Sequence, residues 1–343
     1  MKPIMEKYII VSCLIVVSAL FLVSCSPKLE STPTSIPTIQ AIKTEKPVPT
    51  NTELPTSTLT PTQTFTPVPS TTPTRTPAPD PLEVIKVMQY NVLIGGAVTP
   101  WCKQIRLEYD GWEGESTFED AIEIIRAADP DILIVNEACD WKIPHISDYI
   151  VNKLDMNEFF IGEDFIGGVA PVALFSKYEI IESDSLRYSE QITEETIFRG
   201  IKAKVLTSKG NELIIIGVHL NPSPGKDDYS EYKKEQAKWL AELIMPIQDE
   251  NIILAGDMND TYFVLNPILG EVGLSGLGSK GINQRWESEP HASIDLIYIS
   301  PSLKFSGWSQ DIEFYEALEA NQILWSSISD HNPEAAIIGV YPP

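Results

Sequence analysis

Polar residues that are uncommon inside apolar runs follow several such runs in this sequence, at the point where each run ends. They are Asn91, Glu137, His219, Asp257 with Asn259, Asp295 and, just before the last run, Ser329-Asp330-His331. Carboxylate and amide oxygens bind hard divalent cations, and an imidazole beside a carboxylate transfers protons near neutral pH. Strand ends gathered at one rim of a sheet are where active sites are usually built. The pattern therefore indicates a polar site at such a rim.

Each of these residues also has an ordinary structural interpretation. Asn91 could belong to a turn, Glu137 could be a loop carboxylate, and Gly256–Asp260 could be an Asx-rich turn. A lone histidine on an apolar strand, such as His219, is more often a hydrogen-bonded core residue than a catalytic one. Ser329–Asn332 could be a helix cap. Only the combination of these residues favours a functional site.

Strands must position most of these side chains. Runs rich in valine and isoleucine predict strands at Val84–Tyr90, Ile132–Val135, Val172–Ser176, Gly200–Leu206, Leu213–Leu220, Ile252–Ala255, Ile294–Ser300 and Ala335–Val340. Phe118–Ala128 and Tyr229–Ile244 instead place apolar residues on one stripe at helical spacing and predict helices. The predicted helices are too few for a fold in which every strand is followed by a helix. This favours a sandwich of mixed sheets with helices on the outside.

Taken in order, the motifs resemble those of the endonuclease/exonuclease/phosphatase family. The matching segments are Lys86–Asn91, Asp131–Glu137 with the metal glutamate, Gly168–Tyr178, Gly217–Leu220, Leu254–Asn259 with a Gly-Asp-x-Asn motif, Ser293–Ile297 and Ser329–His331. The resemblance extends from about Val84 to the C-terminus. It implies an α+β fold, a four-layer αββα sandwich of two mixed β-sheets flanked by helices, and divalent-metal-dependent hydrolysis of a phosphate ester.

The resemblance also implies a metal centre. Glu137 is expected to be the principal carboxylate ligand, and Asn91 is expected to be a second ligand or to orient the first. Asp330 is a candidate for a second metal position. Oxygen ligands with open positions for water and substrate suit Mg²⁺, with Mn²⁺ as the alternative.

Five further residues receive catalytic roles from the same resemblance. Asp257 is expected to position and deprotonate the attacking water, and Asn259 to donate to a phosphate oxygen or to the nucleophile. His331 would donate to the phosphate or carry a proton, and Asp295 would fix its tautomer and favour its charged form. His219 would stabilise charge on the leaving group or on another phosphate oxygen.

One further residue resembles the family less specifically, and two positions depart from its pattern. Arg199 resembles a phosphate-contacting arginine, although an ordinary surface arginine fits its context as well. Asn136 stands where the family usually has glutamine, a change that leaves Glu137 usable. Ser293 stands where an arginine is frequent, and this puts in doubt any substrate contact normally made there.

The N-terminus is typical of an exported protein. Lys2 and Lys7 precede an apolar run, Tyr8–Val23, that ends in Leu22-Val23-Ser24-Cys25. This ending resembles a bacterial lipobox, in which Cys25 becomes the lipidated first residue; an uncleaved signal anchor is the alternative. Both interpretations place the protein outside the cytoplasm, and the first predicts lipid anchoring to the bacterial cell membrane. We therefore expect a signal peptide at 1–24, a disordered Thr/Pro-rich linker at 25–80 and one domain at 81–343.

Two cysteines are left for the folded part. Cys13 leaves with the signal peptide and Cys25 takes the lipid, so Cys102 and Cys139 remain. Outside the cytoplasm two such cysteines often pair, which makes a Cys102–Cys139 disulfide one hypothesis and two buried free thiols the other.

The net charge of the chain restricts the kinds of partner that it can bind. The net charge is -23, with the acidic excess in residues 81–343, so the domain has no global basic surface for nucleic acid. A bound cation and a few local basic residues still permit a nuclease. We expect a phosphate-ester substrate, from nucleic acid or a phospholipid headgroup, membrane association through the lipid anchor, and no evident protein partner. A non-catalytic binding or adhesion module is the alternative.

Overall fold

The computed structural model describes residues 80–111, 113–163, 171–187, 199–221, 229–259, 262–276, 294–308, 329, 331 and 333–341. All of them belong to one compact unit, Thr74–Pro343. The expected signal peptide, Cys25 and nearly all of the expected linker lie outside the described residues. Among those described, no helix is long and apolar enough to cross a membrane.

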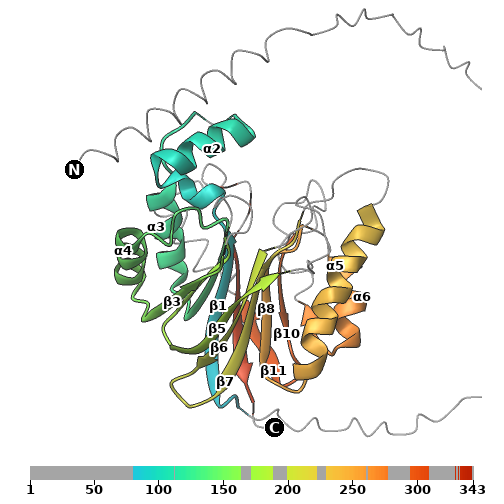
Figure 1. The fold of residues 1–343 in the computed structure, drawn as a ribbon. Coiled ribbons are helices and arrows are strands. Elements are labelled where there is room, and N and C mark those ends of the chain that lie inside the picture. The colour runs from blue at the N-terminus through green and yellow to red at the C-terminus, as the bar shows by residue number, and fades with distance from the viewer. Residues whose placement is uncertain are drawn as a thin grey trace, which may run out of the picture. The chain divides into compact units, whose positions relative to one another are not determined.

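One sheet carries the start and the end of the described chain (Figure 1). Its strands are β1 (Glu83–Asn91), β2 (Ile132–Asn136), β3 (Glu158–Ile161), β4 (Ala173–Ser176), β11 (Leu303–Trp308) and β12 (Glu334–Val340). Their order is β11-β12-β1-β2-β4-β3. β1 and β2 run parallel, whereas every other pair in the sheet is antiparallel. The sheet is therefore mixed.

The second sheet repeats this plan. Its strands are β5 (Glu179–Arg187), β6 (Arg199–Leu206), β7 (Glu212–His219), β8 (Ile252–Asp257), β9 (Ser275–Gly276) and β10 (Asp295–Ile299). They lie in the order β5-β6-β7-β8-β10-β9, and only β7 and β8 are parallel.

Helices α3 (Phe118–Ala128), α4 (Pro144–Leu154), α5 (Tyr229–Ile244) and α6 (Tyr262–Glu271) cover the outer faces of the two sheets (Figure 1). Helix α2 (Pro100–Asp110) lies beyond the strand ends and packs against the short 3-10 turn η1 (Ile94–Ala97), and a second 3-10 turn, η3 (Met245–Ile247), follows α5. α3 and α4 pack on the first sheet, and α5 and α6 pack on the second. A third apolar layer fills the space between the sheets.

The alternation of side chains in β2 shows how the sequence builds these layers. Ile132 and Ile134 lie in the layer between the sheets, whereas Leu133 and Val135 face the helices. A strand apolar on both faces needs cover on both faces, which the four-layer arrangement supplies. The predicted αββα sandwich of two mixed sheets is confirmed.

Candidate active site

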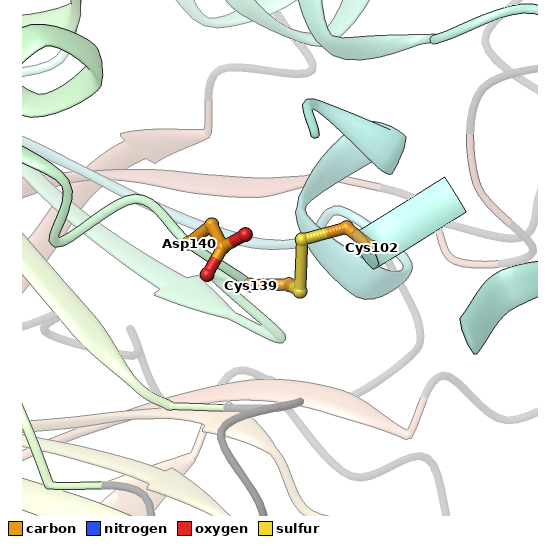
Figure 2. A group of neighbouring side chains, drawn as sticks. All are labelled: Cys102, Cys139 and Asp140. Atoms are coloured by element: carbon orange, nitrogen blue, oxygen red, sulfur yellow. A yellow bond between two sulfur atoms is a disulfide. The ribbon is translucent and has the colours of Figure 1, made fainter. Parts of the chain in front are cut away.

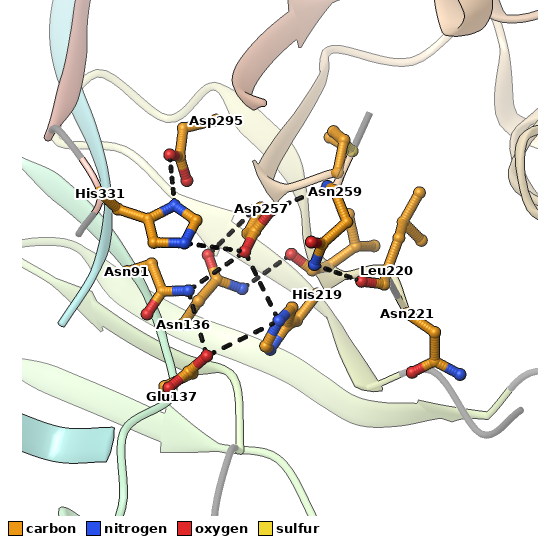
Figure 3. Close-up of polar contacts among 12 residues, drawn as sticks. Asn91, Asn136, Glu137, His219, Leu220, Asn221, Asp257, Asn259, Asp295 and His331 are labelled. Atoms are coloured by element: carbon orange, nitrogen blue, oxygen red, sulfur yellow. Dashed lines mark hydrogen bonds and ion pairs between the residues drawn. The ribbon is translucent and has the colours of Figure 1, made fainter. Parts of the chain in front are cut away.

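The topology brings the polar strand ends to one rim. β1 ends at Asn91, and Glu137 follows the parallel strand β2; His219 and Asp257 end the parallel strands β7 and β8. β10 runs antiparallel to β8, so its first residue, Asp295, pairs with Asp257. Parallel strands end at the same edge, and an antiparallel neighbour begins there. These side chains converge with His331 and Asn259 (Figure 3).

Gly256 allows the two central strands of the second sheet to approach closely. Its φ of 147° lies in a region that L side chains rarely adopt, and a Cβ there would lie 1.8 Å from the carbonyl oxygen of Val218. Glycine is therefore required beside Asp257. After it the chain turns sharply: the Asn259 N–H donates to Asp257 Oδ1 at 2.8 Å, and Asn259 Nδ2 donates to the Leu220 carbonyl at 2.7 Å.

Asp257 lies at the centre of the site. Its Oδ2 accepts from Asn91 Nδ2 at 3.1 Å, and it lies 3.5 Å from His219 Nε2 and 3.6 Å from His331 Nε2. Burial raises the pKa of the Asp257 carboxyl to about 7, and the negative charge of Asp295 adds to the rise. His331 and the hydrogen bonds from Asn259 and Asn91 act in the opposite direction. The Asp257 carboxyl thus titrates near neutral pH, where a carboxylate can both accept and release a proton.

His331 and Asp295 form a hydrogen-bonded pair. His331 Nδ1 lies 2.7 Å from Asp295 Oδ2, so the other ring nitrogen, Nε2, is the one directed at Asp257. Ser329 holds the backbone of this segment, because its hydroxyl donates to the Asn91 carbonyl at 2.7 Å and accepts from the His331 N–H. The predicted pairing of these two side chains agrees with this geometry.

Two buried amides connect the sheets beneath the site. Gln89 Nε2 donates to Asn136 Oδ1 at 2.8 Å and to Asp295 Oδ1 at 2.9 Å. Asn136 in turn donates to the Val218 carbonyl and accepts from the Asp257 N–H. Sequence reasoning did not assign Gln89 any role and noted Asn136 only as a departure from the family. The available signal was an amide inside an apolar strand at both positions.

Glu137 is the most accessible carboxylate of the cluster. Its side chain is 17% exposed, against 1% for Asp257 and 4% for Asp295. The Ile94 N–H donates to Glu137 Oε2 at 2.9 Å, and Asn91 Nδ2 lies 3.3 Å from Oε1. Because Asn91 Oδ1 accepts from the Leu93 N–H, its amide nitrogen faces the carboxylates. In this arrangement the Asn91 amide donates to both Glu137 and Asp257, which suits the expected role of orienting the ligand.

The residues fit a hard divalent cation. Ligand atoms of Asp257, Asp295 and His331 lie within 4.8 Å of one another, and Glu137 approaches His219 Nε2 at 3.9 Å. The pKa of Asp257 is raised chiefly by burial, and the negative charge of Asp295 beside it adds to the rise. A cation bound here would favour the charged forms of these carboxylates. Oxygen donors of this kind suit Mg²⁺ or Mn²⁺.

Other predicted residues are only partly placed. Arg199, the first residue of β6, pairs with His219 in the sheet, but its side chain is not among those described. Asp330, between Ser329 and His331, and the lipidation candidate Cys25 lie outside the described residues. The structure joins Cys102 to Cys139 in a disulfide, rather than leaving two free thiols (Figure 2).

Comparison with known proteins identifies the family and supports the fold. Residues 88–331 match the profile of the Endonuclease/Exonuclease/phosphatase family. Similar solved structures include an endonuclease/exonuclease/phosphatase from Beutenbergia cavernae, with a TM-score of 0.54, 15% identity and coverage of 75% of this chain and 72% of that one. The human Nocturnin catalytic domain with bound sulfate has a TM-score of 0.53 and 18% identity, covering 75% and 94%.

A family protein from Bacteroides thetaiotaomicron has a TM-score of 0.53 and 16% identity, covering 76% of this chain and 99% of that one. At these identities the likeness concerns the fold. A search of curated proteins found no match.

Proposed function

Because this chain belongs to the endonuclease/exonuclease/phosphatase family, whose members hydrolyse phosphate esters, we propose that it is a divalent-metal-dependent phosphodiesterase acting outside the cytoplasm. The observation that carries this proposal is the convergence of Glu137, Asp257 and the Asp295–His331 pair at one rim of the sandwich. A lone core histidine or an Asx turn would not account for that convergence.

The side chains divide the work of hydrolysis among them. Asp257, at the centre of the site beside both imidazoles, holds the attacking water and accepts its proton. His331 directs Nε2 to the site and donates to a phosphate oxygen or carries a proton, while Asp295 fixes its ring. Asn259 and His219 contact the remaining phosphate oxygens or the leaving group.

A cation would be held by Glu137, oriented by Asn91, beside Asp257. When bound, Mg²⁺ or Mn²⁺ neutralises negative charge that develops on the phosphate oxygens. Family members generally use divalent metals, and Asp257, Asp295 and His331 offer further ligand atoms within 4.8 Å of one another in the same site.

The proposed location outside the cytoplasm restricts the candidate substrates to phosphodiesters that are found there. The lipobox-like ending at Cys25 supports lipid anchoring to the cell membrane, and the Thr/Pro-rich stretch to residue 80 supports a tether. An enzyme held there meets extracellular nucleic acid and the phosphodiester headgroups of lipids, so these are the two proposed substrate classes.

Hydrolysis by the detergent-solubilised full chain tests the proposal. Bis(p-nitrophenyl) phosphate and p-nitrophenyl phosphate are compared with Mg²⁺, with Mn²⁺ and with EDTA, beside His331→Ala and Asp257→Ala. We expect metal-dependent turnover of the diester that both variants lose, and that His145→Ala, at an exposed histidine on α4, retains. If DNA, RNA and sphingomyelin also remained intact with metal present, the binding-module alternative would replace the hydrolase.

A further inference from the structure

Five consecutive residues after β1 adopt left-handed backbone angles. Their φ values are 47° at Leu93, 53° at Ile94, 63° at Gly95, 65° at Gly96 and 54° at Ala97. Leucine, alanine and above all β-branched isoleucine rarely adopt such angles. Conformations of this kind persist only where the surrounding structure fixes them. We call residues 93–97 the left-handed turn.

The left-handed turn determines where the Glu137 carboxylate lies. The Ile94 N–H donates to Glu137 Oε2 at 2.9 Å, and the Gly95 N–H donates to the Glu137 carbonyl at 2.5 Å. Glu137 itself has a φ of 58°. The turn therefore contacts both the side chain and the backbone of the proposed metal ligand, and a displaced turn would release both.

Several contacts hold the left-handed turn against the Glu137 loop, which comprises residues 137–141. Trp141 Nε1 donates to the Gly95 carbonyl at 3.1 Å. A Cβ on Gly95 would lie 2.4 Å from the Cys139 carbonyl oxygen, so the two backbones touch. The Thr99 hydroxyl donates to Asp140 Oδ2 at 2.6 Å.

The covalent link in this assembly is the disulfide between Cys102, in the first turn of α2, and Cys139, two residues after Glu137 (Figure 2). Both cysteines are fully buried in a small apolar cluster with Leu93 and Ile94. The Thr99 hydroxyl that binds Asp140 also accepts from the Cys102 N–H, which joins the disulfide to the hydrogen bonds. Although Asp140 lies beside the two sulfur atoms, the sulfurs are bonded to each other and are not thiolate ligands.

We propose that the Cys102–Cys139 disulfide is a positioning element of the metal centre: it holds the left-handed turn against the Glu137 loop and thereby sets the affinity for the divalent cation. This inference rests on the proposed function, because it takes Glu137 as the metal ligand. It predicts that loss of the link weakens cation binding in a chain that is still folded.

Direct Mn²⁺ titration of the full chain, followed by electron paramagnetic resonance, tests the proposal. In the double variant Cys102→Ala/Cys139→Ala, at a temperature where circular dichroism shows the native fold, we expect the Kd for Mn²⁺ to rise about 10- to 100-fold, the range typical when support of a ligand is lost. Turnover at saturating Mn²⁺ should return to within about threefold of the parent, because the catalytic groups remain. Gln104→Ala, at an exposed position of the same helix, should leave the Kd unchanged.

Two further variants separate the possible failures. Glu137→Gln should abolish Mn²⁺ binding; normal binding there would overturn both this inference and the metal assignment in the proposed function. Loss of binding in Glu137→Gln with an unchanged Kd in the folded cysteine variant would overturn the positioning role alone. If the cysteine variant did not fold, the parent chain with its disulfide reduced by TCEP would decide, because reduction keeps both side chains and removes only the covalent link. A Kd about 10-fold weaker is expected, and an unchanged Kd would overturn the proposal.

Discussion

At the scale of single residues, Asp257 shows a conflict between reactivity and stability. Its folded pKa of about 7 lies above the ordinary value of 3.8, mainly because the carboxyl is buried. At a pH between these two pKa values the Asp257 carboxyl is ionised in the unfolded chain but remains protonated in the folded chain. The metal-free fold therefore loses stability as the pH rises from about 4 to 7, and this cost remains above pH 7.

Asp257→Asn should remove this cost together with the catalytic base. In EDTA at pH 8 we expect the variant to melt at a higher temperature than the parent, by about 2–4 °C for each kcal/mol relieved, and the difference to shrink at pH 5. Diester hydrolysis should fall by about 10²- to 10⁴-fold. Thermal melts at both pH values, with Asp148→Asn on the exposed face of α4 as control, measure the effect. A lower melting temperature at pH 8 would contradict the titration assigned to Asp257.

Gln89 acts on the reaction through Asp295. Gln89→Leu would remove a buried hydrogen-bond donor from Asp295 Oδ1 and one of the two donors to Asn136 Oδ1, at a cost of about 1–3 kcal/mol. We also expect kcat to fall at least tenfold and its pH profile to move, because the carboxylate that orients His331 would itself be less well held.

A matched control separates these two effects. Ile85→Val, on the same strand and in the same layer between the sheets, should cost about 0.5–1.5 kcal/mol and leave the pH profile unchanged. If Gln89→Leu were destabilised but kept the parent pH profile, Gln89 would have only a structural role.

At the scale of elements, Glu83 fastens the first strand of one sheet to a turn of the other. Its carboxylate accepts from the Thr207 hydroxyl at 2.5 Å, from Asn211 Nδ2 at 2.8 Å and from the Ser208 hydroxyl at 3.0 Å. Burial alone would raise the pKa of Glu83, but the hydrogen bonds outweigh it and lower the pKa below 4.5. The stability that Glu83 contributes is thus present above about pH 4.5 and is lost as the pH falls through the folded pKa.

Glu83→Ala should destabilise the domain at pH 7 by about 2–3 kcal/mol, as expected for buried hydrogen bonds to a charged group. Below pH 4 the difference from the parent should diminish. Urea unfolding at pH 7 and at about pH 3 measures this, and Glu179→Ala, at an exposed position at the start of β5, provides the control. A constant difference at both pH values would show that the carboxylate charge is not the source of the stability.

The elements also show what the sequence could predict. Strands such as β2 and β7 are apolar on both faces, so an uninterrupted run of apolar residues of strand length marks them in the sequence. The helices α3 and α5 begin and end where predicted. α6 was missed because Pro267 lies within it, and β5 because most of its side chains are exposed. The strands β3, β9 and β11 and the helices α2 and α4 were also not predicted.

The site was predictable to a similar extent. Polar residues at strand ends indicated which side chains should meet, and the described ones do. The sequence could not show that Leu93 fixes the amide of Asn91, or that Gln89 reaches across to Asp295, because these contacts depend on how two sheets pack. Asp330 and the Arg199 side chain stay predictions.

At the scale of the whole molecule, the proposed lipid anchoring to the membrane can be tested independently of catalysis. Cys25→Ala should move the protein from the membrane fraction to the medium, or leave it unprocessed with its leader attached, because the proposed lipid is lost. Cell fractionation with immunoblotting measures this, and Cys13→Ala, within the expected leader, should remain anchored. Membrane retention of a cleaved chain without lipid would contradict the lipoprotein assignment.

The position of β12 has a consequence for the time at which the site forms. β1 lies inside its sheet only because β12, the last strand of the described chain, pairs between it and β11. In a growing chain that has not yet reached residue 340, β1, the strand that ends at Asn91, is therefore an edge strand without β12 beside it. Before residue 331 is added, the chain also lacks the proposed catalytic imidazole of His331. We expect such a nascent chain not to hydrolyse phosphodiesters, and we expect activity to begin only when synthesis of the domain is almost complete.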